Sequence, residues 1–131
     1  MRSIICVVAG LIVVMAVFVA GTAAATELIV PGGLFGAATG PVDAIPATFF
    51  AGSLVVLAMG TVIGGWVTAR MAPSREMMHV AALAGLILVM ALGTLRAESG
   101  EPIWYVYALP FFGIIGTLLG GWLRSRVVVE A

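Results

Sequence analysis

The chain of 131 residues contains little charge and few chemically reactive side chains. It has one cysteine, Cys6, and one histidine, His79, and all six of its basic residues are arginines. A single cysteine cannot form an intrachain disulfide, and one cysteine with one histidine cannot complete the usual ligand set of a structural zinc site. Charged residues make up 9% of the chain, against roughly 25% in soluble domains.

Apolar residues, in contrast, are abundant. They account for 63% of the chain, and the mean hydropathy is +1.23. A soluble fold of this size leaves roughly 30% of its chain surface in water and cannot hide so much apolar surface. The net charge is zero, so no global field attracts nucleic acid. The composition excludes a soluble enzyme, a disordered chain and a nucleic-acid-binding protein, and it predicts a polytopic protein whose partner is the lipid bilayer.

Four uncharged runs predict four transmembrane helices. They cover residues 4–25, 46–69, 77–95 and 102–123, and each is 19 to 24 residues long. Crossing the hydrocarbon layer takes about 20 helical residues at a rise of about 1.5 Å each. We therefore expect an all-α fold, a four-transmembrane-helix bundle that forms a single integral membrane domain over residues 1–131.

The arginines predict the orientation of these helices. Five of the six flank the same side of the predicted bundle, and only Arg96 lies on the other. The five are Arg2, Arg70, Arg75, Arg124 and Arg126. By the positive-inside rule, the N and C termini are both expected in the cytoplasm. The alternative for the first run is a signal peptide cleaved after Ala25, but about 20 apolar residues exceed the usual 7–15, so we expect a retained helix.

An internal repeat links the first half of the chain to the second. Residues 60–70 read G-T-V-I-G-G-W-V-T-A-R and residues 116–126 read G-T-L-L-G-G-W-L-R-S-R, with six of eleven positions identical at an offset of 56. Residues 9–16 and 84–91 match at seven of eight positions at an offset of 75. The pattern predicts a tandem duplication, with repeat 1 over 1–72 and repeat 2 over 73–126. We expect two parallel helical hairpins related by an axis along the membrane normal.

The repeated segments contain small residues spaced four apart, which let two helix backbones approach closely in lipid. Threonines beside them can form hydrogen bonds across the contact or to their own helix. The candidate helix-packing residues are Gly60, Thr61, Gly64, Gly65, Gly116, Thr117, Gly120 and Gly121. Such a face serves either packing within this bundle or association with a second subunit.

Aromatic residues and arginines at the ends of the runs predict anchors at the membrane interface, because indole rings favour the headgroup zone and arginine extends toward water. The candidate anchors are Trp66, Arg70, Trp104, Tyr105, Trp122 and Arg126. At the helix starts, Pro46 and Pro102 suit the first helical position, and Ser74 suits a cap of the third helix. Pro110 predicts a kink in the fourth.

The segment 26–45 is apolar and rich in glycine and proline, unlike a solvated loop. Connections longer than about 12–15 residues are usually functional or disordered, and this one is too apolar for disorder. We expect it to serve either as a lid over the bundle or as a surface that docks a partner.

The four runs contain no charged side chain, which a proton relay or an ion-coupled carrier needs within the membrane. The chain also offers no catalytic set of residues, so we expect no enzyme activity, no cofactor and no metal. The leading hypothesis is a structural or accessory subunit that acts through helix–helix association, with other membrane-protein subunits or with itself. The alternative is an oligomeric channel or facilitator for a small solute.

Residues 64–73 read G-G-W-V-T-A-R-M-A-P, His79 follows at the start of the third run, and Pro102-Ile103-Trp104-Tyr105 opens the fourth. This pattern resembles a widespread group of small bacterial four-helix membrane proteins over residues 46–126. Thr68 stands where that group has alanine. The resemblance implies a multi-pass location in the bacterial cytoplasmic membrane, and it implies no activity.

Overall fold

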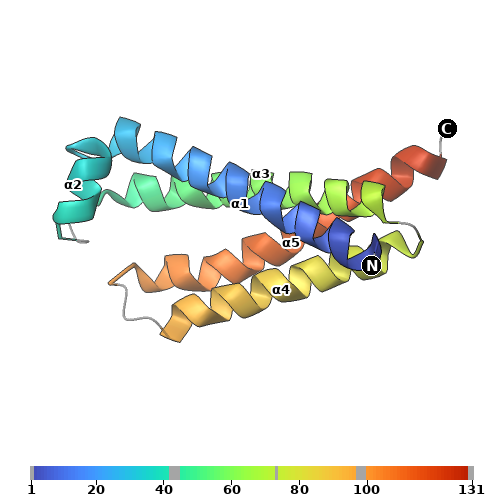
Figure 1. Cartoon of the computed structure of the whole chain (residues 1–131). Helices are drawn as coiled ribbons and strands as arrows, with labels where there is room; N and C mark the ends of the chain where they lie inside the picture. The colour runs from blue at the N-terminus through green and yellow to red at the C-terminus, as the bar shows by residue number, and fades with distance from the viewer. Residues whose placement is uncertain (1, 42–44, 73, 97–99, 130–131) are drawn as a thin grey trace.

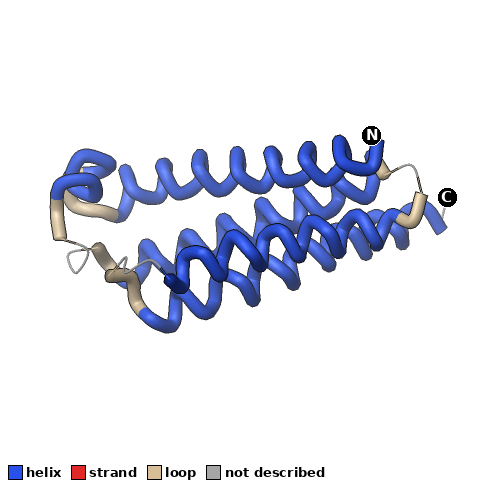
Figure 2. The backbone as a smooth tube through the Cα atoms, turned by 60° about the horizontal axis from the view of Figure 1, so that its bottom comes forward, coloured by secondary structure: helices blue, strands red, loops and turns tan. Residues whose placement is uncertain are grey.

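The computed structural model of the chain is all-α and describes residues 2–41, 45–72, 74–96 and 100–129. Figure 2 shows these parts of the chain as helices joined by short loops. The helices of the described residues are α1 (Arg2–Ile29), α2 (Gly33–Thr39), α3 (Ala47–Met71), α4 (Glu76–Arg96) and α5 (Ile103–Val129). The four helices other than α2 are long and apolar enough to cross a membrane, which confirms the four expected spans.

The long helices extend beyond the uncharged runs that predicted them. α1 continues four residues past Ala25 to Ile29, and α5 continues six residues past Leu123 to Val129. Both extensions include charged residues, Glu27 in α1 and Arg124 in α5. A charged residue ends an uncharged run in the sequence, but it does not end a helix whose charged side chains can reach the headgroup zone. The helices are therefore longer than the uncharged runs, and the span bounds at 25 and 123 stay predictions.

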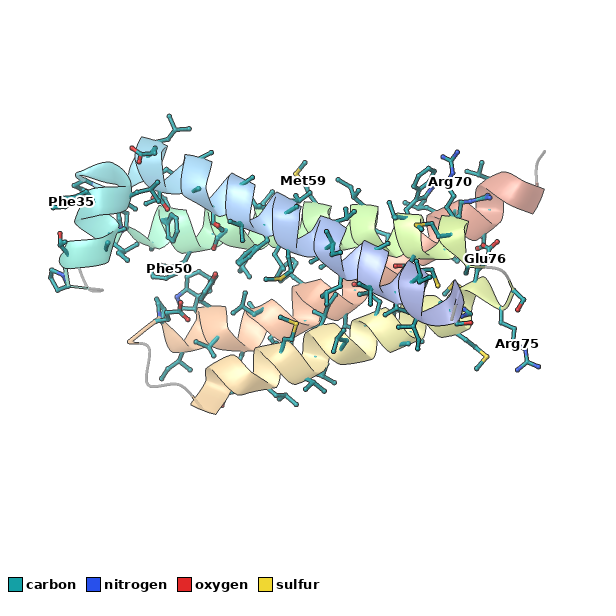
Figure 3. All side chains as sticks on the ribbon, in the orientation of Figure 1. Phe35, Phe50, Met59, Arg70, Arg75 and Glu76 are labelled. Atoms are coloured by element: carbon teal, nitrogen blue, oxygen red, sulfur yellow. The ribbon has the colours of Figure 1, made fainter. Side chains whose placement is uncertain are left out.

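The helices lie side by side in the order α1, α3, α5, α4 (Figure 1). α3 has the most extensive contacts, with α5 on one side and α1 on the other, and α4 packs mainly against α5. The start of α1 and the end of α5 lie at the same end of the bundle, together with Arg70 and Arg75 (Figure 3). We call this the arginine-rich end, and the opposite end, which carries α2, the α2 end.

Two groups of buried side chains form the core. Val14 of α1 packs against Leu83 and Ile87 of α4, and Phe50 of α3 packs against Tyr105 of α5 with ring centroids 5.0 Å apart. Most other large apolar side chains point outward, as expected of helices whose surroundings are lipid.

The helix starts differ from expectation by one or two residues. Pro46 directly precedes α3, and its carbonyl accepts a hydrogen bond from the amide of Phe49, 2.9 Å away. The carbonyl of Pro102 accepts one from the amide of Tyr105 in the same way. Both prolines are thus caps rather than first helical residues, since a missing N–H is harmless at either position. Ser74 does not precede α4 directly; Arg75 does, with a left-handed φ of 50°.

α5 runs without interruption through Pro110. A proline in a helix leaves the carbonyl four residues earlier, that of Val106, without its usual N–H partner. The kink at this position stays a prediction.

The apolar segment between the first two spans is not the loop that the sequence predicted over its whole length. α1 continues into it, and α2 follows after a turn in which Gly32 and Gly33 have positive φ angles of 81° and 59°. Gly32 cannot cap α2 with a side chain, and the carboxylate of Glu27 replaces it by accepting a hydrogen bond from the amide of Leu34, 3.2 Å away. This bond ties α2 to the end of α1. Residues 42–44 of the segment lie outside the described residues.

Candidate functional site

Two of the predicted packing glycines of α3, Gly60 and Gly64, face α1. A Cβ atom added to Gly64 would lie 2.8 Å from the carbonyl oxygen of Gly10, and one added to Gly60 would lie 3.3 Å from that of Val14. The contact is reciprocal, because a Cβ at Gly10 would lie 2.8 Å from the carbonyl oxygen of Gly64. The two backbones therefore touch with no room for side chains between them.

The equivalent glycines of α5 face α3. A Cβ at Gly120 would collide with the carbonyl oxygen of Val62, and one at Gly116 would lie 3.1 Å from that of Ala58. In the opposite direction, a Cβ at Gly65 of α3 would collide with the carbonyl oxygen of Thr117. Backbone atoms again form the contact, so neither partner can move aside as a flexible side chain would.

Gly121 completes the set by facing α4, where a Cβ would lie 2.7 Å from the side chain of Val80. All six predicted glycines are buried. The structure thus places them in contacts within the chain, and none of them forms an exposed face for a second subunit.

The predicted threonines are fully buried but bond to their own helices. Thr61 Oγ1 donates to the carbonyl of Leu57 at 2.9 Å, and Thr117 Oγ1 donates to that of Gly113 at 2.7 Å. Neither hydroxyl bridges to another helix. Thr68, which the sequence analysis did not select, is also buried next to Gly10, and its hydroxyl has no hydrogen-bond partner among the described residues.

Tyr105, a predicted anchor at the membrane interface, is buried inside the bundle. Its side chain is 5% exposed and points toward α3, where its hydroxyl lies 3.0 Å from Ser53 Oγ. Ser53 also donates to the carbonyl of Phe50 at 2.8 Å. A serine has one proton and a carbonyl only accepts, so the tyrosine donates to Ser53 and the three groups form a chain.

A periodic signal for this pair is present in the sequence. Ser53 lies seven residues before Gly60, and Tyr105 lies eleven before Gly116, so both fall on the glycine-bearing side of their helices. Trp104, one position before Tyr105, is exposed, as an anchor at the membrane interface requires.

The anchor residues at the arginine-rich end form two equivalent pairs. The guanidinium carbon of Arg70 lies 5.1 Å from the ring centroid of Trp66, and that of Arg126 lies 4.5 Å from the ring centroid of Trp122. These are cation–π distances. The structure therefore brings each predicted arginine onto the predicted tryptophan of its own repeat.

An apolar cavity of about 190 Å³ lies between α1 and α4 near the middle of the bundle. Met15 and Phe18 line one side, and Ile87 and Met90 line the other. Within the described residues, no three His, Cys, Asp or Glu side chains gather in a way that could hold a metal ion.

The glycine contacts predict opposite effects of alanine at two positions. Gly120→Ala should lower the free energy of unfolding by about 1–3 kcal/mol, because the new methyl group collides with α3. Gly85→Ala should leave it unchanged or raise it by up to about 1 kcal/mol, because nothing lies within 4 Å and alanine favours the helix. Unfolding by dodecyl sulfate in mixed micelles, followed by circular dichroism, measures both. Equal effects of the two variants would contradict the assignment of Gly120 to a backbone contact.

The Tyr105 hydroxyl can be tested against its neighbour Tyr107, which is exposed on the same helix. Tyr105→Phe should lower the free energy of unfolding by about 1 kcal/mol through loss of the bond to Ser53. Tyr107→Phe should change it little. The same micelle titration compares them, and an equal loss in the two variants would rule out the buried hydrogen-bonded chain.

Comparison of the chain with protein-family models, with curated proteins and with solved structures gives no match. A function for the chain is therefore argued from its own residues and geometry.

Proposed function

We propose that this chain is a non-catalytic, multi-pass subunit of the bacterial cytoplasmic membrane that acts by associating with another membrane protein. In this proposal the chain is a pair of tandem hairpins, 1–72 and 73–126, with both termini in the cytoplasm. Two observations support the orientation. Five of the six arginines flank one side of the spans, and the start of α1 and the end of α5 lie together at the arginine-rich end.

A surface at the α2 end carries the proposal for association. We call it the α2 ledge and define it by three exposed apolar side chains, Leu28 at the end of α1 and Leu34 and Phe35 on α2. Leu28 is 85% and Phe35 79% exposed, and Figure 3 shows Phe35 on α2 at the far end of the molecule. The bond from the Leu34 amide to Glu27 holds α2 against α1, so these side chains are presented on an ordered element.

The position of the α2 ledge relative to the bilayer distinguishes it from ordinary lipid-facing surface. The 28 residues of α1 span about 42 Å, against about 30 Å for the hydrocarbon layer. With the arginine-rich end at the cytoplasmic interface, as proposed, the excess length of α1 falls at the α2 end. The proposal therefore has the end of α1 and α2 in the opposite headgroup region, where large apolar side chains gain little from lipid. Exposed aromatic and aliphatic side chains on a fixed element are typical of an interface that another protein covers.

The interior of the bundle favours this proposal over a channel or facilitator, which needs polar groups along a continuous path. Thr22, Thr26, Thr61 and Thr117 each donate to a carbonyl of their own helix. The buried hydroxyl of Thr68 has no partner among the described residues, but a single polar group does not form a continuous path. The cavity between α1 and α4 is lined by hydrocarbon and thioether side chains.

The orientation predicts which single cysteines a membrane-impermeant maleimide reaches in spheroplasts. Cys6 is 1% exposed and can be replaced by alanine to leave a cysteine-free background. In that background Phe35→Cys should be labelled in intact spheroplasts, and Ser125→Cys should be labelled only after lysis. The reason is that α2, which carries Phe35, and the end of α5, which carries Ser125, lie at opposite ends of the bundle (Figure 1). Labelling of Ser125→Cys before lysis would reverse the proposed topology.

The proposal for association predicts a cross-link from one position at the α2 end. A photoreactive side chain in place of Phe35 should form one defined adduct in membranes, and the same group in place of Ile103 should not. Ile103 is a matched control because it is 76% exposed, near the 79% of Phe35, but starts α5 instead of lying on the α2 ledge. Denaturing electrophoresis and mass spectrometry identify the adduct.

A second variant makes this test quantitative. Phe35→Asn should reduce co-extraction of the cross-linked protein in mild detergent by at least about tenfold, as removal of a central aromatic anchor does. Ile103→Asn should leave co-extraction unchanged. Adducts to lipid alone from position 35, or equal losses in both variants, would count against a protein partner at the α2 ledge.

A further inference from the structure

A groove lies between the first turns of α1 and α4 at the arginine-rich end, far from the α2 ledge. It is an open groove with a volume of about 760 Å³. Its rim is polar and consists of Ser3 at the start of α1 and of Ser74, Arg75 and His79 around the start of α4. Its walls are apolar and include Ile4, Val7 and Val8 of α1 and Ala82 and Leu86 of α4.

Arg75 is the charged residue among those that line this groove. Within the described residues, its guanidinium forms no ion pair with a carboxylate. Its guanidinium is exposed, and its one hydrogen bond is a long contact of 3.8 Å to the sulfur of Met78. Glu76 is next in sequence, but it does not line the groove, and Figure 3 shows the two side chains pointing in different directions. Arg70 and Arg126, at the same end, lie instead against tryptophan rings.

The backbone holds Arg75 in place over the groove. Its φ of 50° is in the left-handed region, which side chains other than glycine and asparagine seldom adopt. Two contacts to its carbonyl oxygen maintain this conformation, one from the amide of Met78 at 2.9 Å and one from Nδ1 of His79 at 3.2 Å. Because a carbonyl only accepts, Nδ1 is the donor, so His79 is a positioning residue for Arg75.

The walls continue from the rim toward the middle of the membrane. Val8 of α1 faces Ala82 and Leu86 of α4, and all three are exposed. The apolar cavity lined by Met15 and Ile87 lies further along the same two helices. A cationic rim above an apolar seam between α1 and α4 matches the shape and polarity of one phospholipid, with its phosphate at the rim and an acyl chain along the seam.

We propose that this groove binds an anionic phospholipid of the surrounding leaflet. Arg75 pairs with the phosphate, the hydroxyls of Ser3 and Ser74 are donors beside it, and an acyl chain lies between α1 and α4. The net positive charge of the rim selects an anionic headgroup over a zwitterionic one, whose own cation would lie next to Arg75. This proposal does not depend on the α2 ledge.

The experiment is native mass spectrometry of the full chain released from detergent, titrated with dioleoyl phosphatidylglycerol, dioleoyl phosphatidylcholine or inorganic phosphate. Phosphatidylglycerol should be retained at about tenfold lower concentration than phosphatidylcholine, the difference expected of one charge-assisted pair. Inorganic phosphate should not be retained, since it lacks the acyl chain. Equal retention of the two lipids, or retention of phosphate alone, would overturn the proposal.

Two variants locate the site. Arg75→Asn should bring the retention of phosphatidylglycerol down to that of phosphatidylcholine, and it should not disrupt the turn, because asparagine tolerates a left-handed φ. Arg75→Lys should keep most of the preference. Arg126→Asn is the matched control, and it should leave the preference unchanged because Arg126 lies on Trp122, away from the groove.

A third variant tests the apolar wall. Ala82→Trp should obstruct the seam and weaken the retention of both lipids, whereas Phe35→Asn should affect neither. An unchanged preference in Arg75→Asn, an equal loss in Arg126→Asn, or full retention in Ala82→Trp would each contradict the groove as the site. A failure of the partner proposal at Phe35 would not alter these results.

Discussion

Backbone contact along α3 determines where every other long helix lies. In lipid, apolar side chains gain nothing by turning away from their surroundings, so specific helix pairs depend on close van der Waals contact and on weak Cα–H···O bonds. α3 provides such contact on two sides, through Gly64 toward α1 and through Gly65 toward α5. Since the opposing atoms are carbonyl oxygens, the helices could accommodate a side chain at these positions only by separating. α4 then takes its position from α5, where Val80 fills the space beside Gly121.

The four spans could be predicted from the sequence because bilayer thickness sets both their length and their lack of charge. The ends of the helices could not, since Glu27 and Arg124 continue a helix once their side chains reach water. The inward position of Tyr105 depends on how α5 is rotated about its axis. Trp104, the neighbouring aromatic residue, was predicted to be an anchor on the same grounds, but its side chain is exposed and that of Tyr105 is buried. The positions of the glycines could have predicted this rotation, because Tyr105 lies on the same side of α5 as Gly116.

Some features required contacts between segments that no local pattern encodes. The start of α2 depends on the carboxylate of Glu27, seven residues before the amide that it accepts from. The groove at the arginine-rich end depends on Ser3 and Arg75, which are far apart in sequence and meet because α1 and α4 run alongside each other. Inside the bundle, by contrast, Thr26, Thr61 and Thr117 satisfy their hydroxyls within their own helices, and Thr68 is the exception among the described buried threonines. The interior therefore provides packing and little chemistry. Polar and aromatic groups that are free to interact are concentrated at the two ends.

The duplication in the sequence was expected to give two hairpins related by one axis, and the packing does not follow that expectation. An axis that carried α1 onto α4 would also place α4 in the groove of Gly116 and Gly120, but α3 occupies that groove. Instead, each glycine-bearing face contacts a neighbouring helix in the series α1, α3, α5, α4. The groove of Gly60 and Gly64 receives α1, the equivalent groove of α5 receives α3, and the next glycine of each helix, Gly65 or Gly121, faces the helix that follows.

These glycine contacts are head-to-tail, so the series leaves one unmatched repeat face at each end, although α1 and α4 also pack against each other through Val14, Leu83 and Ile87. The consequence is visible in α4, the last helix of the series. Gly10 and Val14 of α1 are buried against the bundle, while their equivalents on α4, Gly85 and Val89, are exposed. The same short sequence thus has two environments in one chain. The copy on α4 is exposed because the glycine groove of α5, which is equivalent to the groove that holds α1, is already filled by α3.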